Sequence, residues 1–159
     1  GILRTIKKFQ EITGAFTFHM IGDRPERYSD LIRELGIKGS HISIIDELPQ
    51  EQLSQKMATA DVFVLFSRNE NLPCVILESF SCGVPVISTE VGGIGEYFPS
   101  DFGVLINEGD ENALLQTLLR VYHKKTVFSN PHKMHEYAET HFSKKKIAST
   151  FSALYLSKI

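Results

Sequence analysis

Two carboxylates, Glu70 and Glu78, are the residues whose type and spacing best suit ligand chemistry in this chain. They lie eight positions apart, and Pro73 between them predicts a helix start, because proline is favoured at the first helical position. Leu72 would then be the cap, and leucine has no side-chain oxygen that accepts backbone N–H groups. The first amides of the helix would therefore stay free at the positive end of its dipole, where phosphate binds well.

These free amides would belong to Cys74 and Val75. Glu78 would lie about 7 Å further along the axis, at about 1.5 Å per residue, with its side chain tilted back toward the helix start. A diphosphate bound at that start would leave its ribose within reach of the carboxylate. Two simpler interpretations stay open. Asn71 could cap the helix, and Glu78 could be a solvated surface residue, although no Lys or Arg lies three or four positions from it.

Composition indicates one globular domain and excludes several functions. The chain has 159 residues, of which 42% are hydrophobic and 23% charged, and its net charge is −2. Because no basic stretch alternates with aromatic residues, we expect no nucleic-acid binding. No apolar run is long enough to span a bilayer and no secretory leader is visible, so the cytoplasm is the expected compartment. Cys74 and Cys82 are expected to be reduced, since one helix would hold them about 12 Å apart.

Strand-like and helix-like segments alternate along the chain, which predicts an α/β fold. The expected strands cover residues 15–21, 41–45, 61–66, 84–88 and 104–106, and the expected helices cover residues 2–9, 31–35, 50–59, 73–82 and 110–122. This alternation implies a parallel sheet with helices on both faces, and ligands gather beyond the carboxyl ends of such strands. The loops that we expect to converge there are residues 22–26, 46–48 and 67–72.

Charge is unevenly distributed along the chain. From Asn69 to Leu119 there is no Lys or Arg but there are eight carboxylates, so an anionic ligand would need cations from another loop or from outside this sequence. After Tyr122 the chain becomes more basic, and the lysine run 144–146 leads into an amphipathic segment. A solvated face is the simpler interpretation of this run, and peripheral contact with an anionic membrane is the alternative.

Five segments, taken in order, resemble the retaining, metal-independent glycosyltransferases of the glycosyltransferase 4 type. They are IGDRPER (21–27), ADVFVLFS (60–67), ENLPCVILESFSCGVPVIST (70–89), VGGIGE (91–96) and GVLINEGDENAL (103–114). The resemblance implies the GT-B architecture, in which two Rossmann-like domains face each other across a cleft and the C-terminal one holds the nucleotide-sugar donor. Residues 1–159 resemble that C-terminal domain alone, including C-terminal helices at about 129–158. The N-terminal acceptor domain and the first strand, which would be central in the sheet, are expected to be absent from this sequence.

The resemblance also implies roles for individual residues. Glu70 would lie near the donor sugar as the catalytic residue, and Glu78 would accept hydrogen bonds from the ribose hydroxyls. The remaining donor-binding residues are expected to be Asn71, Leu72, Cys74 and Val75 at the sugar and phosphates, Ile45 and Asp46 at the base, and Gly22 and Arg24 in the first loop. Arg24 stands where the family often has glycine, so it could supply a cation or simply face solvent.

The implied activity is transfer of a hexose from a nucleotide-sugar, a UDP- or GDP-sugar first of all, to an acceptor hydroxyl in polysaccharide, lipopolysaccharide or glycolipid synthesis. No metal and no cofactor is implied, because the nucleotide-sugar is a substrate. The main partner would be the missing N-terminal domain of the same polypeptide, and the chain alone would transfer no sugar. The enzyme would be cytoplasmic, with peripheral contact at the inner face of the membrane left open. A non-catalytic nucleotide-binding domain and a flavodoxin-like interaction domain are the alternatives, whereas His132 and His135 lack the further ligands of a zinc site.

Overall fold

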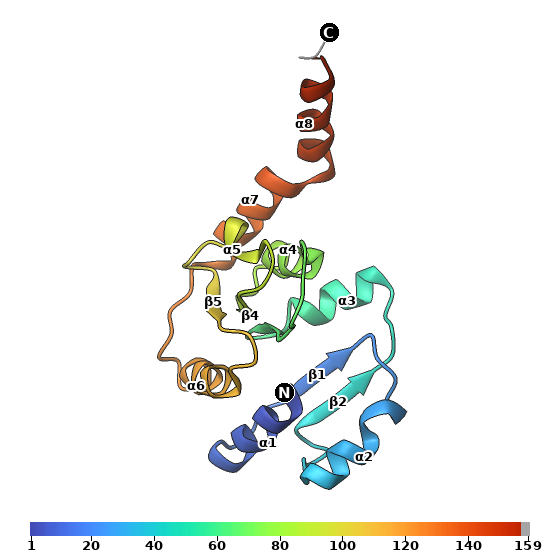
Figure 1. Ribbon diagram of the computed structural model, residues 1–159, viewed down its shortest axis with the longest axis vertical. Helices are drawn as coiled ribbons and strands as arrows, with labels where there is room; N and C mark the ends of the chain where they lie inside the picture. The colour runs from blue at the N-terminus through green and yellow to red at the C-terminus, as the bar shows by residue number, and fades with distance from the viewer. Residues whose placement is uncertain (157–159) are drawn as a thin grey trace.

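The computed structural model describes residues 1–156, which form five strands and eight helices (Figure 1). In chain order the elements are α1 (Ile2–Ile12), β1 (Phe18–Ile21), α2 (Glu26–Leu35), β2 (Ile42–Ile45), α3 (Gln50–Met57), β3 (Phe63–Leu65), α4 (Cys74–Ser81), β4 (Val86–Thr89), α5 (Ile94–Tyr97), β5 (Gly103–Ile106), α6 (Glu111–Tyr122), α7 (Pro131–Phe142) and α8 (Lys144–Leu156). Every expected strand and helix is confirmed within a few residues. The last two positions of the expected C-terminal helices, 157 and 158, lie outside the described residues. The short helix α5 is additional, because four residues carry no helical period.

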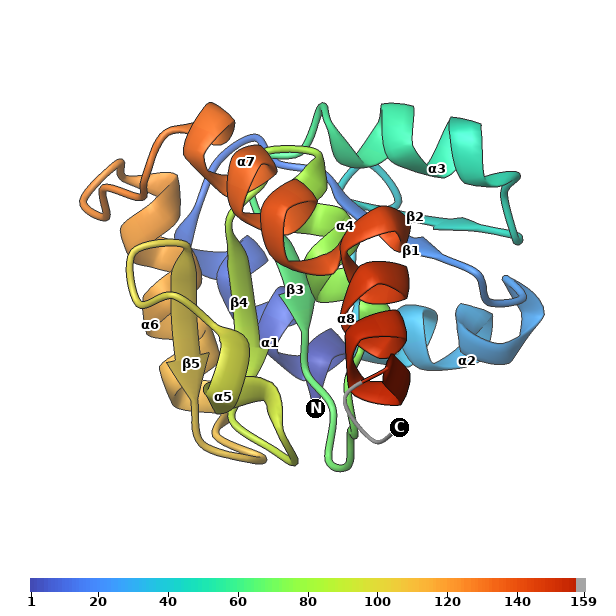
Figure 2. The same cartoon turned by 90° about the horizontal axis from the view of Figure 1, so that it is seen from above.

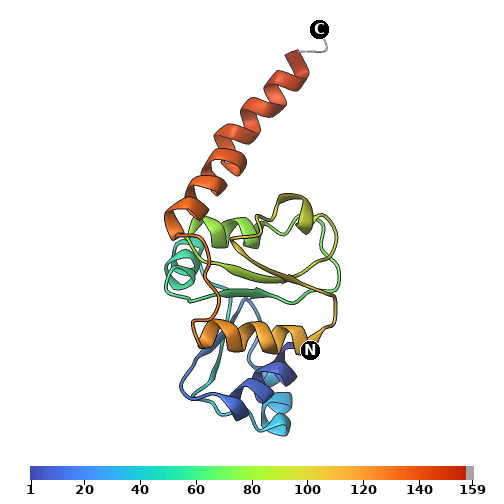
Figure 3. The ribbon, with the colours of Figure 1, turned by 90° about the vertical axis from the view of Figure 1, so that its left-hand side faces the viewer.

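Strands β3, β4 and β5 form one parallel sheet in the order β3-β4-β5. Helices α1 and α6 pack together on one face of this sheet, and α4 and α7 pack together on the other (Figure 3). A strand with helices on both faces is buried on both sides, so its sequence is a continuous apolar run and does not alternate between apolar and polar residues. The run from Val84 to Ile87 has that character, and the expected α/β class is confirmed.

The central strand β4 supplies the core of both layers. Its four residues are all buried, and successive side chains point to opposite faces of the sheet, as strand geometry requires. Val86 packs in the cluster that contains Phe80 of α4, whereas Ile87 packs in the cluster that contains Ile6 of α1 and Leu114 of α6. Each of these five side chains is at most 2% exposed. The two cores are therefore continuous through β4.

Strands β1 and β2 form a second parallel sheet, in which Phe18 pairs with Ile42 and Ile21 with Ile45. Within residues 1–156 no ladder of hydrogen bonds joins β1 to β3, and β1 and β2 lie to one side of β3, β4 and β5 (Figure 2). Side chains of β1 and β2 nevertheless belong to the same core cluster as side chains of α1. No residue of β1 or β3 is buried, in contrast to β4. Both strands thus keep one edge that pairs with no described strand.

Helix α8 extends away from the rest of the molecule (Figure 3). None of its described residues is buried, and its apolar side chains Ile147, Phe151 and Tyr155 are 41%, 57% and 73% exposed. The lysines at positions 144–146 are exposed, as the solvated interpretation of this run requires. Among residues 1–156, no helix combines the length and the apolar character that crossing a bilayer would need.

Candidate functional site

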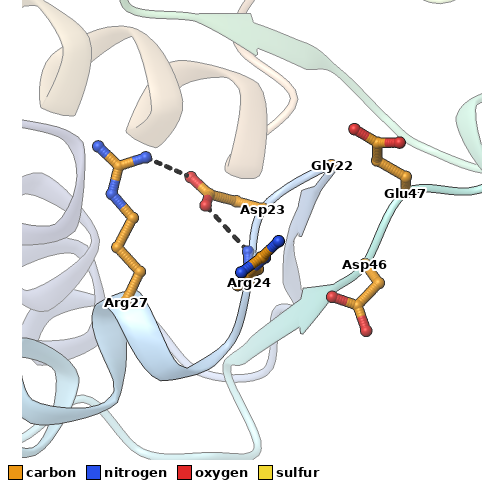
Figure 4. A pocket seen from close by; sticks show the side chains of 6 residues that line it. All are labelled: Gly22, Asp23, Arg24, Arg27, Asp46 and Glu47. Carbon is orange, nitrogen blue, oxygen red and sulfur yellow. Dashed lines mark hydrogen bonds and ion pairs between the residues drawn. The ribbon is translucent and has the colours of Figure 1, made fainter.

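The loops that follow β1 and β2 meet, as the topology predicts. The Gly22 N–H donates a hydrogen bond to the Ile45 carbonyl at 3.0 Å, so the two chains stay side by side just beyond the strands. Gly22 has a φ of 89°, a left-handed conformation that glycine adopts without steric cost. The two loops enclose a pocket of about 570 Å³, lined by Gly22, Asp23, Arg24, Arg27, Asp46 and Glu47 (Figure 4).

Charged groups of both signs line this pocket. Asp23 accepts hydrogen bonds from the Tyr28 hydroxyl at 2.6 Å, from the Arg24 backbone N–H at 2.9 Å and from Arg27 at 3.3 Å. The Tyr28 hydroxyl is the largest of several causes that lower the pKa of Asp23, followed among the lowering causes by the Arg24 amide and Arg27. Asp23 is therefore a fixed carboxylate that holds the turn in shape. The carboxylates of Asp46 and Glu47 point away from each other (Figure 4).

Arg24 is exposed at the pocket, and its guanidinium forms no ion pair within residues 1–156. Arg27, by contrast, reaches back from the first turn of α2 to form an ion pair with Asp23 in the preceding loop. Both earlier interpretations of Arg24 stay compatible with this position, because a solvent-facing guanidinium beside a pocket can also meet an anion.

The start of α4 is open, as the sequence predicts, although its boundary differs by one residue. Pro73 is the N-cap and Cys74 the first helical residue, so the expectation that Leu72 caps the helix is wrong. The cause is the extended ψ of 105° at Pro73, which its fixed φ of −70° allows as readily as a helical one. No side chain hydrogen-bonds at this cap, so the alternative that Asn71 caps the helix is also wrong. Cys74 is exposed, which leaves the helix start open to solvent.

The two candidate carboxylates flank this helix start in different surroundings. Glu70 is half-buried in the loop that follows β3, close to Tyr97. The Tyr97 hydroxyl is buried without a hydrogen-bond partner among residues 1–156. Burial, followed by the nearby Cys74 and Glu70, raises the pKa of Tyr97 to about 12. This phenol is therefore neutral and able to donate.

Glu78 is exposed and lines a smaller cavity of about 200 Å³ between α3 and α4. The other lining residues are Gln50, Leu53, Ser54, Met57, Ser81 and Cys82. The Cys82 thiol contacts the Ser54 carbonyl at 3.7 Å, and burial raises its pKa. Both cysteines are free, which confirms the expected reduced state. Glu70 lines neither this cavity nor the first pocket.

The predicted donor residues are thus distributed over three places. Gly22, Arg24 and Asp46 line the first pocket, and Glu78 lines the second. The others line neither cavity and lie at the ends of β2 and β3 or at the start of α4: Ile45, Glu70, Asn71, Leu72, Cys74 and Val75. No group of three or more metal-ligating side chains occurs in the described part of the chain. His135 instead has its Nδ1 2.7 Å from the Ser81 carbonyl, which joins α7 to α4.

Several residues at the site had not been predicted. Asp23, Arg27 and Glu47 line the first pocket, and Thr89 binds the loop after β3. The four-residue spacing of Asp23 and Arg27 is the usual distance of an ion pair on a helix and was a usable signal. The sequence holds no comparable signal for Thr89, because a threonine at the end of an apolar strand does not indicate which loop its hydroxyl binds.

Most of the chain matches a family of known proteins. Residues 1–141 match the family described as glycosyl transferases group 1. N-acetyl-alpha-D-glucosaminyl L-malate synthase of Bacillus anthracis is 28% identical over 165 aligned residues, which cover 96% of this chain and 42% of the relative. Sulfoquinovosyl transferase SQD2 of Arabidopsis thaliana is 35% identical over 109 residues, which cover 66% of this chain and 21% of the relative. The chain thus spans less than half the length of these relatives.

Solved structures agree on the fold. Sucrose-phosphate synthase from Thermosynechococcus elongatus superposes with a TM-score of 0.82 at 23% identity, over 98% of this chain and 41% of that one. The apo form of the lipopolysaccharide outer core galactosyltransferase WaaB gives a TM-score of 0.78 at 25% identity, over 98% of this chain and 45% of that one. The expected Rossmann-like half of a GT-B architecture is confirmed by these neighbours.

Proposed function

Because the chain belongs to the glycosyl transferases group 1 family, we propose that it is the donor-binding part of a retaining glycosyltransferase. The full-length protein moves a hexose from a UDP- or GDP-sugar to an acceptor hydroxyl without a metal. The two relatives are named as proteins that act on sugars, which supports this class of reaction. The product belongs to polysaccharide, lipopolysaccharide or glycolipid synthesis.

The single observation that carries the proposal is the open start of α4 between Glu70 and Glu78. Free amides at Cys74 and Val75 suit the donor diphosphate, since backbone N–H groups and the helix dipole both favour an anion there. Glu78, one turn further along the helix, accepts hydrogen bonds from the ribose hydroxyls. Asn71 and Leu72 contribute backbone groups to the sugar side.

The first pocket suits the nucleobase. It lies beyond the carboxyl ends of β1 and β2, where ligands of open parallel sheets bind. In this arrangement the backbone around Ile45 and Asp46 pairs with the base, and Gly22 leaves room for it. Arg24 lies on the same side, and its guanidinium, which forms no ion pair within residues 1–156, is available for the phosphates.

The residues that approach the leaving nucleoside diphosphate determine the chemistry. Transfer breaks the bond between the sugar and the diphosphate, so negative charge develops on the leaving oxygen. The amides at the start of α4 stabilise that charge without rearranging. Glu70, half-buried in the loop that precedes α4, lies near the donor sugar in this arrangement and is its catalytic residue.

We further propose that the full-length protein supplies one more strand and an acceptor-binding N-terminal domain. The edges of β1 and β3 that pair with no described strand are where this parallel strand would bind. In the full-length protein, slow amide exchange is expected along β1 and β3; fast exchange there would exclude the added strand. In this proposal the chain alone transfers no sugar and the enzyme is cytoplasmic, with peripheral contact at the inner face of the membrane left open.

Substitution of Glu70 tests the catalytic assignment. Glu70→Gln in the full-length protein keeps the size of the side chain and removes its charge, so sugar transfer should fall at least about 100-fold. Glu34→Gln on the exposed face of α2 is the matched control and should leave turnover unchanged. Nucleotide binding with undiminished transfer by Glu70→Gln would favour a non-catalytic role for this carboxylate. Absence of any nucleotide binding would favour an interaction domain.

A further inference from the structure

The loop that carries Glu70 begins at Ser67, and both backbone groups of Ser67 bind one side chain. The Thr89 hydroxyl donates to the Ser67 carbonyl at 2.6 Å and accepts from the Ser67 N–H at 3.1 Å. Thr89 is 0% exposed, so water cannot replace either bond. The start of the loop is therefore fixed to the end of β4.

This side chain continues the sheet beyond its last backbone pair. The ladder between β3 and β4 ends where Leu65 pairs with Ser88, while the backbone of Thr89 pairs with Ile106 of β5. Thr89 thus uses its backbone toward one neighbouring strand and its hydroxyl toward the other. The hydroxyl holds Ser67 at the point where the chain leaves the sheet toward Glu70.

Two further contacts hold the same loop from the turn after β4. The Gly93 N–H donates to the Asn71 carbonyl at 3.3 Å. Gly92 adopts a φ of 58°, and a Cβ at this position would overlap the Glu70 carbonyl oxygen. The backbone of Glu70 therefore lies between two anchored residues, three positions after Ser67 and one before Asn71.

We propose that Thr89 is a positioning residue that fixes the loop 67–71 and, through it, the Glu70 carboxylate relative to the start of α4. The proposal rests on the role of Glu70 given under the proposed function. Without the hydroxyl, both backbone groups of Ser67 lose their partner in a buried place, and the loop must move to recover one. A shift of about 1 Å at a reacting group can lower turnover by about 100-fold.

The test compares three variants of the full-length protein in a sugar-transfer assay. Thr89→Val removes the hydroxyl at nearly constant shape and should lower kcat about 10- to 100-fold. KM for the nucleotide-sugar should stay within about threefold, because most of the proposed donor contacts, to diphosphate and ribose on α4 and to the base in the first pocket, lie outside the loop 67–71. Thr89→Ala is a second variant with the same expected effect. Thr89→Ser keeps the hydroxyl and should retain kcat within about threefold of the wild type.

Thr5→Val is the matched control. Thr5 is also 0% exposed, but its hydroxyl has no hydrogen-bond partner within residues 1–156, so kcat should not change. Amide exchange supplies a readout independent of turnover. In Thr89→Val, exchange should accelerate at residues 67–71 and stay slow at Val86 and Ile87.

The outcomes separate this inference from the proposed function. Wild-type kcat in a folded Thr89→Val or Thr89→Ala variant would overturn the inference, provided that Glu70→Gln is inactive in the same assay. Full activity of Glu70→Gln would instead overturn the proposed function on which it rests. Loss of the whole fold in both Thr89 variants would overturn the inference as well, because the inference confines the effect of the hydroxyl to the loop 67–71.

Discussion

The half of the molecule built on β3, β4 and β5 differs from the half built on β1 and β2 in how completely it is packed. Every residue of β4 is buried, and helices cover both faces of its sheet. No residue of β1 is buried, and α2 contributes no buried residue at all. The loop after β3 is anchored at three points, whereas the loop after β1 is held mainly through one carboxylate, Asp23.

This difference suggests a division of labour within the donor site. The packed half presents the open start of α4 and Glu70 in fixed positions, which suits the reacting end of a donor. The less packed half presents a wide, charged pocket at its surface, which suits the base end, where a ligand needs to enter and leave. The following predictions test this contrast, from the largest expected effect to the smallest.

Truncation of an aromatic side chain should show the largest difference in stability between the two halves. Phe80, 0% exposed, contacts Phe98 and Phe102 edge to face, so Phe80→Ala should cost about 3–5 kcal/mol of the free energy of unfolding. Phe18→Ala in β1 should cost at least about 1 kcal/mol less, because that ring is only partly buried and loses less apolar area. Urea unfolding measures both. Equal costs would show that the two halves are packed alike.

Glycine substitutions compare the two loops directly. Gly92→Ala and Gly22→Ala both place a side chain at positive φ, which costs about 1–2 kcal/mol. A Cβ at Gly92 also overlaps the Glu70 carbonyl, whereas a Cβ at Gly22 meets nothing within 4 Å. Gly92→Ala should therefore lower the free energy of unfolding by at least about 1 kcal/mol more than Gly22→Ala does. The difference measures how closely the Glu70 loop packs against the turn after β4. A Gly22 variant as unstable as the Gly92 variant would contradict that seating.

An ion pair between α1 and α6 gives the smallest effect. The Arg4 Nη2 lies 2.7 Å from Glu111 Oε1, and this hydrogen bond is the main cause that lowers the pKa of Glu111 from 4.5 to about 2. Because the pKa is lower in the folded state, the pair stabilises above about pH 4.5 and loses its effect as the pH falls toward 2. Glu111→Gln should cost at most about 1 kcal/mol at neutral pH, since Arg4 is exposed, and nothing near pH 2.

Chemical denaturation at several pH values measures this difference. Arg4→Gln removes one of two cationic partners of Glu111, the other being the Gly1 amino group at 3.1 Å, and should reproduce part of the same pH dependence. A stability gap between wild type and Glu111→Gln that grows as the pH falls would contradict the assignment.

Much of the fold could be read from the sequence because its elements follow local rules. Apolar runs such as 84–88 predict buried strands, and Pro73 predicts a helix start to within one residue. The cap itself could not be read, because proline fixes φ but leaves ψ to the incoming loop. The open helix start was predictable all the same, since neither leucine nor proline can cap.

The arrangement around the site was less predictable, because it depends on side chains that meet across the fold. Ser67 and Thr89 are 22 positions apart, and only the register of β3 on β4 brings them together. The Asp23 network combines a helical spacing with a bond to Tyr28 that no pattern specifies. Likewise, alternating strands and helices predict one sheet, but they do not reveal which strands keep an edge without a partner in the described residues, as β1 and β3 do here.

Calorimetric titration of the full-length protein with UDP, GDP and ADP tests the central claim most directly, with Glu78→Ala beside it. Glu139→Ala, on the exposed face of α7, is the matched control. One nucleotide should bind the wild type and the control equally, and Glu78→Ala should weaken its binding about 10-fold or more, since a carboxylate hydrogen-bonded to hydroxyls is worth about 1.5–3 kcal/mol. Unchanged affinity in Glu78→Ala would show that the nucleotide does not bind at the start of α4.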